Sequence, residues 1–484
     1  MLFNSYIFIL LFLPLCLCGW YGLNRIRLYA VAQLFLLAMS LWFYGYFNPS
    51  YLPIIILSIV FNYSASQLMK KTSNHKLKKA EMIFAVLVNI GCLFYYKYFD
   101  FFISNVNALF SKDYTLLNIV LPLGISFFTF QQISYVVDAY RGEIENCNFL
   151  EYACFVTYFP QLIAGPIVSH DELIPQFMDK SKKVICWSNM AKGFYIFVLG
   201  LAKKVLIADR FGQIANFGFG NIHELNLFSG ILVILAYTFQ VYFDFSGYCD
   251  MAIGLGKMMN IDLPVNFDSP YKALTITEFW DRWHKTLTRF FTKYVYIPLG
   301  GNRKGTLRTY INIMLVYLVS GLWHGANWTF IVWGILHGLF SIFTRYKKDY
   351  FEKLHPVCSW MILFLFLNGT WTIFRADTLN DVYLLAKQML FNPYGEIAPE
   401  ILLAFESKII AGFFDSPYLY NIYSVLTTIT IYFSTLYVVL GTRNAYERME
   451  KFEFGIPYVL TTSILLVESI ISLSSVSTFL YFNF

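Results

Sequence analysis

Charge is scarce in this chain. Only 14% of its 484 residues are Asp, Glu, Lys or Arg, whereas a typical soluble domain is about a quarter charged. Hydrophobic residues make up 57% of the sequence and its mean hydropathy is +0.54. This composition predicts an all-α protein that crosses a membrane many times and has the lipid bilayer as its main partner. The formal charge of +6 is modest and its basic residues sit in short loops, so we expect no nucleic-acid binding.

Several catalytic and metal-binding motifs are also missing. None of the eight cysteines forms a C-x-x-C pair, so we expect neither a disulfide framework nor a metal site. The sequence has no H-E-x-x-H, no P-loop, no dinucleotide G-x-G-x-x-G and no G-x-S-x-G, which argues against the commonest hydrolase and nucleotide-driven functions. No basic residue precedes Arg25. Leu2–Trp20 is therefore predicted to be a retained first helix and not a cleaved signal peptide.

Loop charges predict how the helices are oriented. The basic loops that follow Trp20 and Met69 fall on the same side if each helix crosses once, with two crossings in the charge-free stretch 28–69. The positive-inside rule makes that side cytoplasmic and places the N-terminus outside, as in a multi-pass protein of the bacterial cytoplasmic (inner) membrane. Further crossings are predicted at Met82–Phe99, Leu116–Val137, Ala191–Ile207, Phe228–Cys249, His355–Phe374, Asn421–Leu440 and Ile456–Ser472.

Two other segments complete the predicted topology. Tyr152–Val168 is uncharged but interrupted by Pro160 and Gly165-Pro166, and both its ends lie on the cytoplasmic side, so it is predicted to be re-entrant. Residues 376–420 are predicted to be an amphipathic excursion on the outer face. We expect about 10–12 spans in one membrane domain, 1–484. Within it, residues 1–110 supply N-terminal helices, 111–375 a catalytic core, and 376–484 the outer segment and last helices.

The most informative gap in charge runs from Tyr310 to Thr344, yet it contains His324 inside Gly321–Trp328. Both flanks are basic, so we expect a hairpin with His324 near its tip, deep in the membrane or toward the outer half. An imidazole there is costly unless it has a partner or a function, and histidine is the usual acid/base residue. The alternative is a packed histidine bonded to a carbonyl.

The neighbours of His324 suggest how its ring is set. If the segment is helical, Asn327 and Trp328 share the face of His324, and Asn327 fixes the imidazole tautomer. Gly321 and Gly325 leave room for a substrate or for a neighbouring backbone. His337 lies further along the run and is predicted to pack.

A second candidate region is Thr277–Leu287, rich in tryptophan and mixed charge. We expect an interfacial helix that lines a polar cavity, with Trp280 four residues and Asp281 three residues before His284. The carboxylate of Asp281 would then orient or charge the imidazole. The alternative is a plain interfacial anchor with a surface salt bridge.

Two further groups carry charge. Asp244 and Asp250 lie in or near a crossing, where they need a cation, and Arg282 or Lys257 is the predicted partner; a structural ion pair is favoured over a catalytic role. The Gly300-Gly301 turn with Arg303 and Lys304 could hold an anionic donor at the cytoplasmic mouth. An ordinary basic loop explains that turn equally well.

Together these segments resemble the membrane-bound O-acyltransferase (MBOAT) family, and within it the alginate O-acetyltransferase (AlgI-like) branch. The similarity covers nearly the whole chain and its motifs occur in order. They are Tyr158–Gln161, Ala164–Ile167, Phe243–Tyr248, Met251–Gly256, Ile276–Trp280, Arg282–His284, Tyr296–Arg303, Gly321–Ala326, Ile373–Asp377 and Phe479–Phe482. Asp281 departs from the family pattern, in which a basic residue is expected, and Thr370–Thr372 departs modestly.

The resemblance implies a ring of helices with a thin centre, and a central tunnel that joins the two membrane faces. It implies that His324 is the family's central histidine and His284 its second polar residue. It also implies transfer of an acyl group, usually acetyl, from a cytoplasmic donor toward a polysaccharide or cell-wall polymer outside. An extracytoplasmic SGNH/GDSL-like protein is the implied partner.

The hypothesis from sequence is therefore O-acyl transfer across the membrane. His324 acts as general base on the acceptor hydroxyl and His284 positions or polarises the donor carbonyl. The tryptophans Trp280, Trp283, Trp323 and Trp328 line the tunnel and keep water from the thioester. No bound cofactor is expected; acetyl-CoA or an acyl-carrier thioester serves as the donor substrate. The alternatives are D-alanyl transfer to teichoic acid, which Ile297–Asn302 argues against, and a non-enzymatic polysaccharide transporter.

Overall fold

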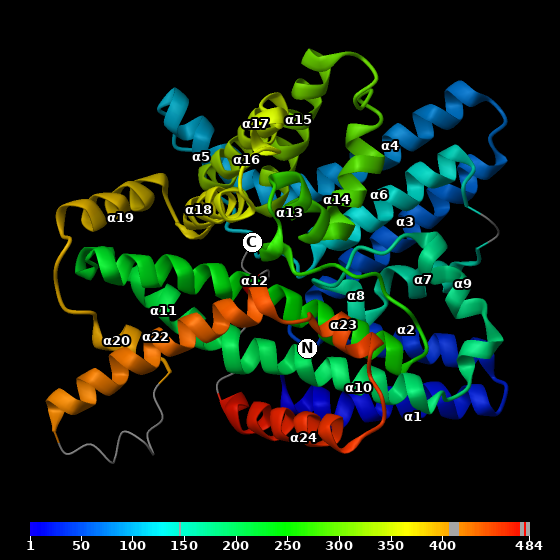
Figure 1. Cartoon of the computed structure of the whole chain (residues 1–484). Coiled ribbons are helices and arrows are strands. Elements are labelled where there is room, and N and C mark those ends of the chain that lie inside the picture. Colours follow the sequence, from blue (N-terminus) through cyan, green and yellow to red (C-terminus); the bar gives the residue numbers. More distant parts are fainter. Residues whose placement is uncertain (145–146, 406–415, 475–478, 481–484) are drawn as a thin grey trace.

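The computed structural model describes residues 1–144, 147–405, 416–474 and 479–480, and every regular element within them is a helix (Figure 1). Six helices there are long and apolar enough to cross a membrane: Phe8–Arg25, Pro49–Lys71, His75–Phe110, Leu227–Met258, Pro356–Arg375 and Tyr418–Gly441. Tyr29–Gly45 and Ile456–Ile471 are shorter apolar helices. The chain is an all-α polytopic membrane protein, as predicted. Residues 406–415 of the predicted outer-face segment, and Tyr481 and Phe482 of the motif Phe479–Phe482, lie outside the described residues.

The N-terminal half contains α1 (Leu13–Arg25), α2 (Tyr29–Gly45), α3 (Leu52–Lys71), α4 (His75–Leu93), α5 (Phe99–Phe110), α6 (Ile125–Arg141), α7 (Phe149–Thr157), α8 (Phe159–Leu162), α9 (His170–Met178), α10 (Trp187–Ala202), α11 (Asp209–Gly220) and α12 (Leu227–Met258). The C-terminal half contains α13 (Ile276–Arg282), α14 (Lys285–Phe291), α15 (Thr306–His324), α16 (Trp328–Tyr346), α17 (Lys348–Phe351), α18 (Pro356–Arg375), α19 (Leu379–Phe391), α20 (Pro399–Leu403), α22 (Pro417–Gly441), α23 (Ala445–Glu450) and α24 (Ile456–Ile471).

The long helix α12 runs through the middle of the molecule and packs along α10 (Figure 1). Glycines face each other across this contact at a spacing of seven residues. A Cβ added to Gly200 would lie 2.6 Å from the carbonyl oxygen of Gly247, and one added to Gly193 would lie 2.6 Å from that of Gly254. Since lipid offers little hydrophobic drive for association, such small residues let two backbones approach closely enough for van der Waals packing.

Buried amides join α4 to its neighbours α3 and α6. Asn62 and Asn89 exchange side-chain hydrogen bonds of 3.1 and 2.6 Å, and Asn62 Nδ2 also donates to Gln132 Oε1 at 2.8 Å. Polar contacts of this kind hold membrane helices together, because an unsatisfied amide in hydrocarbon costs free energy. They fix α4, which leads through a π-helical turn at Phe94–Tyr98 into α5.

The charge-free run forms the predicted hairpin. Its first arm is α15 and its second arm is α16, and Gly325–Asn327 makes the turn between them. The arms pack closely because a Cβ on Gly321 would lie 2.4 Å from the Phe330 carbonyl oxygen. Gly321 thus serves the approach of a neighbouring backbone. A Cβ on Gly325 would lie 2.0 Å from the Phe330 ring, so this glycine also makes room for packing.

The segment after α6 is broken at the predicted interruptions and is buried. The helices α7 and α8 are short, and residues 163–169 continue without helix while remaining largely buried in protein. The predicted crossing Leu116–Val137 is wrong in its first part. The helix begins only at Ile125, because Pro122 lacks an N–H and Gly124 has a left-handed backbone with φ 70°.

The ion pairs of Asp244 and Asp250 form, but the predicted partners are wrong. Lys204 Nζ lies 2.6 Å from Asp244 Oδ1, and Lys203 Nζ lies 2.6 Å from Asp250 Oδ2. Arg282 instead pairs with Glu278 and Lys257 with Asp262. The two lysines come from the turn of helix between α10 and α11 that packs on α12. The backbone N–H of Leu480 donates to the other oxygen of Asp244 at 2.9 Å.

Candidate active site

His324 is the last residue of α15 and is 4% exposed. Its imidazole is enclosed by aromatic rings: the ring centroids of Trp323, Trp333 and Phe374 lie 4.9, 5.2 and 5.2 Å away, each near a perpendicular arrangement. The helix must end here, because Gly325 adopts an extended backbone and the chain turns into α16. The hairpin tip therefore holds His324 within the protein and away from lipid.

The helix does not continue to Asn327 and Trp328, so these residues do not share a helical face with His324. Asn327 caps α16 by accepting a hydrogen bond from the Thr329 N–H at 3.1 Å and donates to the Asp377 carbonyl at 2.8 Å. Trp328 is 53% exposed and its Nε1 donates to Asn105 Oδ1 at 2.9 Å. Asn327 is thus the N-cap of α16, a role that one continuous helix through His324 and Asn327 did not allow for.

His284 lies between α13 and α14 with a left-handed backbone, φ 47°. This break separates it from Asp281, and its partner is Asn266, whose Oδ1 lies 3.0 Å from His284 Nδ1. The same oxygen accepts hydrogen bonds from the backbone N–H of Thr286 at 3.3 Å and from its hydroxyl at 2.9 Å. Asn266 Oδ1 thus acts as an acceptor, so His284 Nδ1 must carry the proton. In neutral His284, Nε2 then presents a lone pair.

Asn266 lies in a stretch of chain that is held in place by hydrogen bonds and ion pairs. Asp262, nearby in the same stretch, accepts hydrogen bonds from Lys257 at 2.8 Å and Lys182 at 2.9 Å, and its backbone N–H and carbonyl both bond to Gln176. Burial raises the pKa of the Asp262 carboxyl, but the two lysines outweigh it and leave that pKa below its usual value. These contacts tie the stretch between α12 and α13 to α9.

One aromatic side chain links the two histidines. The Trp323 ring lies 4.9 Å from the His324 ring and 6.0 Å from the His284 ring. Phe127 packs against both Trp323, at 5.3 Å, and His284, at 6.4 Å. His284 and His324 therefore line one aromatic cluster, although they come from separate elements.

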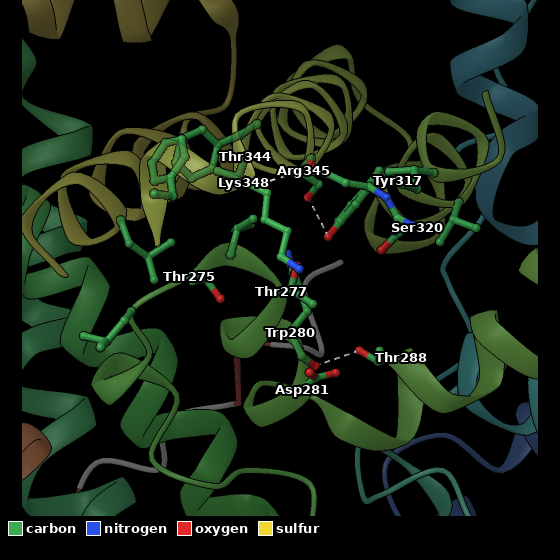
Figure 2. Close-up of a pocket in the computed structure, with 18 of the residues that line it drawn as sticks. Thr275, Thr277, Trp280, Asp281, Thr288, Tyr317, Ser320, Thr344, Arg345 and Lys348 are labelled. Carbon is green, nitrogen blue, oxygen red and sulfur yellow. Dashed lines mark hydrogen bonds between the residues drawn. The ribbon is translucent and has the colours of Figure 1, made fainter. Parts of the chain in front are cut away.

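A cavity of about 700 Å³ opens at the base of the α15–α16 hairpin, and we call it the base cavity. Trp280, Asp281 and Thr288 lie on one side of it and Arg345 and Lys348 on the other (Figure 2). Tyr317 and Ser320 of α15 contribute to its wall. The hydroxyl groups, the two cations and the carboxylates of Asp281 and Glu352 make its mouth polar, with Lys348 Nζ 3.5 Å from Glu352 Oε1. Apolar side chains line much of the rest, among them Leu287, Phe291, Val316, Phe340 and Leu363.

A second cavity of about 1040 Å³ lies at the opposite end of the hairpin, and we call it the tip cavity. Gly325, Ala326 and Asn327 of the turn line it. It contains charged and amide side chains together with aromatic rings, including Lys97, Asp100, Lys204, Asp209, Gln213, Asn216, Gln240, Arg375 and Asp377. Amides and carboxylates beside aromatic faces suit a hydroxylated ligand, because they offer both hydrogen bonds and apolar contact.

A small cavity of about 20 Å³ reaches His324 and Trp323. It shares Lys97 and Leu121 with the tip cavity. The base cavity has no lining residue in common with either. His324 is therefore next to the tip-side space, while Trp333 and Trp280 stand between it and the base cavity, with ring centroids 5.8 Å apart.

The other predicted site residues lie as follows. Trp280 and Asp281 line the base cavity, Trp323 the small cavity and Asn327 the tip cavity. Trp283 lines none of these cavities; it is buried against Phe279 and Trp371, at 5.5 and 5.0 Å. Arg282 is bound to Glu278 and the Asp268 carbonyl, and Arg303 and Lys304 are exposed and outside the cavity walls.

His337 is fully buried, as expected for a packed residue, but it lies near the site. Its Nε2 is 3.1 Å from Thr370 Oγ1, and its ring lies 4.5 Å from Trp333 and 5.2 Å from Trp280. Thr370 Oγ1 already donates to the Leu367 carbonyl, so it accepts from His337 and the ring carries its proton on Nε2.

Several residues of the site were not anticipated, namely Lys97, Asn266, Trp333, Arg345 and Lys348. Lys97 lies in the wall of the tip and small cavities, and Asn266 holds His284. Lys97 carried a signal: it is a single cation inside the predicted crossing Met82–Phe99, and an intramembrane ionisable residue is a functional candidate by default. Asn266 carried none, because its role depends on a turn in the backbone.

Comparison with known proteins gives a consistent result. The model of the membrane-bound O-acyltransferase family matches residues 43–375. The peptidoglycan O-acetyltransferase of Helicobacter pylori is 39% identical, across 100% of this chain and 98% of that protein. The protein named probable alginate O-acetylase AlgI of Pseudomonas aeruginosa is 39% identical across 80% of this chain and 75% of its own length. The teichoic acid D-alanyltransferase of Streptococcus thermophilus is 27% identical across 45% of this chain and 55% of that protein.

Proposed function

Because the chain belongs to the membrane-bound O-acyltransferase family, as the match over residues 43–375 shows, we propose that it moves an acetyl group from a cytoplasmic thioester to a cell-wall polymer outside the membrane. It is an acyltransferase, since its relatives are named O-acetyltransferases. Peptidoglycan is the proposed polymer, because the relative named for it aligns along essentially the whole of both chains.

The position of His324 carries the proposal. It ends α15 beside the tip-side space and is one indole away from Trp280, which lines the base cavity. The base of the hairpin carries Arg303, Lys304, Arg345 and Lys348. The positive-inside rule then assigns the base cavity to the cytoplasm and the tip cavity to the outer side of a bacterial cytoplasmic membrane.

The base cavity fits a thioester donor such as acetyl-CoA. Arg345 and Lys348 at its mouth would bind phosphate groups, and its mixed hydroxyl and apolar wall would accommodate an extended thioester arm. The tip cavity would admit the acceptor hydroxyl group. An extracytoplasmic SGNH/GDSL-like protein is the proposed partner that completes transfer to the polymer.

In the proposed reaction the acceptor oxygen forms a bond to the acetyl carbonyl carbon, and the bond from that carbon to sulfur breaks. His324 takes the proton of the attacking hydroxyl and returns it to the leaving thiolate. We do not assign His284 the role that the sequence suggested, which was to polarise the donor carbonyl. Its Nδ1 proton is committed to Asn266, so neutral His284 offers Nε2 as an acceptor, which can hold a hydroxyl or thiol proton in place.

Acetate esters in the wall test the proposal. A deletion strain carrying the His324→Ala chain should produce normal amounts of membrane-inserted protein and intact peptidoglycan, but its purified sacculi should release about 100-fold less acetate in mild base than sacculi from the strain with the unsubstituted chain. His223→Ala, which changes an exposed histidine, is the matched control and should restore acetate fully.

The outcomes separate the alternatives. Acetate retained in the His324→Ala strain at equal protein level would overturn the assignment of the base. Release of D-alanine in place of acetate would identify a D-alanyltransferase. Loss of the polymer itself from the envelope would indicate a transporter.

A further inference from the structure

The chain between α4 and α5 makes a π-helical turn at Phe94–Tyr98, where one extra residue is accommodated in the helix. Turns of this kind redirect side chains and are frequent at functional sites. Here the turn faces the end of α15, far away in sequence. Lys97 and Tyr98, its last two residues, both reach that helix end.

The contacts are directed at three consecutive carbonyl groups. Tyr98 donates its hydroxyl to the Leu322 carbonyl at 2.8 Å. Lys97 Nζ donates to the Trp323 carbonyl at 2.6 Å and to the His324 carbonyl at 3.1 Å. It also lies 3.4 Å from Ser126 Oγ of α6.

These carbonyl groups need external partners. The last four carbonyls of an α-helix have no acceptor role within the helix, and in a membrane interior each unsatisfied group costs free energy. The C-terminal end of a helix also carries partial negative charge, which a cation stabilises. Lys97 supplies both a cation and directed N–H donors at the residue that bears the imidazole.

The lysine is placed to act on the site and not only on the fold. It lines the small cavity together with His324 and Trp323, and it lines the tip cavity as well. Its ammonium group lies 6.0 Å from the centre of the Trp323 ring, whose indole packs against both His284 and His324. A shift of Lys97 would therefore move the backbone that carries His324 and the ring that separates the two histidines.

We propose that Lys97 is a positioning residue for the acyl transfer, which holds His324 at the end of α15 by binding the carbonyls of Trp323 and His324, with Tyr98 fixing the preceding carbonyl. This inference rests on the proposed role of His324. In this proposal the π-helical turn has a function, because it directs Lys97 toward the end of α15 that carries His324.

Substitutions in the turn test this assignment. Membrane vesicles from the complemented deletion strain would be supplied with radiolabelled acetyl-CoA, and base-labile label in the sacculus fraction would be measured against donor concentration. Lys97→Met should lower kcat by about 100-fold, the loss expected when a catalytic group is displaced by about 1 Å. The apparent KM for acetyl-CoA should stay unchanged, because Lys97 does not line the base cavity.

Conservative variants test whether activity is kept when the side chain still supplies its hydrogen-bond donors. Lys97→Arg keeps the cation and the donors and should retain most of the activity. Tyr98→Phe removes only the bond to Leu322 and should cost less than about tenfold. Lys79→Met makes the same side-chain change at the exposed end of α4 and should leave both constants unchanged.

A double variant separates positioning from folding. In the His324→Ala background, Lys97→Met should cause no further loss of residual turnover, since it acts through the imidazole. A further loss there, an equal loss in Lys97→Arg and Lys97→Met, or a change confined to KM would overturn the proposal. If His324→Ala itself keeps full activity, the proposed function fails. If His324→Ala is inactive and Lys97→Met is fully active, only the positioning role fails.

Discussion

The imidazole of His324 packs edge-on against the indole of Trp333, with ring centroids 5.2 Å apart and ring planes at 82°. Trp333 is fully buried, and its other neighbours include Trp280 in the wall of the base cavity. The ring thus stands on the route between the proposed donor space and the proposed base. A thioester that waits beside this ring would be shielded from water on the tip side.

We expect Trp333→Leu to uncouple the reaction. The smaller side chain would open a gap beside His324, and water from the tip side could then reach the donor thioester. Release of coenzyme A from acetyl-CoA without acceptor should rise relative to acetyl transfer, measured by thiol titration and by base-labile acetate in the same vesicles. Trp187→Leu, at an exposed tryptophan, should leave the ratio unchanged, as should Trp333→Leu if the ring has no sealing role.

The two cations at the mouth of the base cavity should set donor affinity. Replacing Arg345 and Lys348 together by Gln should raise the apparent KM for acetyl-CoA about tenfold and leave kcat unchanged, because the lost attraction acts on binding alone. Raising ionic strength should raise KM in the unsubstituted protein. Lys353→Gln, at an exposed lysine outside the cavity wall, is the control. An unchanged KM in the double variant would place the donor elsewhere.

The hairpin was predictable from sequence and its fine structure was not. Absence of charge from Tyr310 to Thr344 between basic flanks predicts a hairpin with a turn near His324, and the structure has two helices, α15 and α16, joined by a turn there. The position of the helix end was missed because the spacing of Asn327 from His324 is compatible with one continuous helix, whereas asparagine is also a favoured residue at the start of a new helix, as it is here for α16. Which of the two applies depends on the close packing of α16 on α15.

The partners of the buried charges could not be predicted from the sequence either. Asp244 and Asp250 needed cations, and that much followed from burial in a membrane. The actual partners, Lys204 and Lys203, are fixed by the packing of α10 and α12 at their facing glycines. A sequence gives no measure of which helices adjoin. The same reason explains why Asp281 looked like the partner of His284 while Asn266 holds it.

Asn266 should matter as much as the imidazole it holds. Asn266→Leu keeps the approximate volume and removes the acceptor oxygen, so His284 would lose its fixed tautomer and ring orientation. We expect kcat to fall at least about tenfold, with no additional loss when the substitution is combined with His284→Ala. Thr286→Val leaves the Asn266–His284 bond in place and should cost less. Additive losses in the double variant would show that Asn266 acts independently of His284.

The glycine contact between α10 and α12 should limit stability without touching the site chemistry. Gly200→Ala would bring a Cβ to 2.6 Å from the Gly247 carbonyl oxygen, a backbone atom that can move only if the helices separate. Overpacking of this kind costs about 1–3 kcal/mol, so the thermal midpoint of the detergent-purified protein should fall. Gly91→Ala has open space around the added methyl and should hold or raise the midpoint, since alanine favours helix over glycine. Equal midpoints for the two variants would mean that α10 and α12 are not in the close contact described. In that case the placement of Lys203 against Asp250 and of Lys204 against Asp244 would also be wrong.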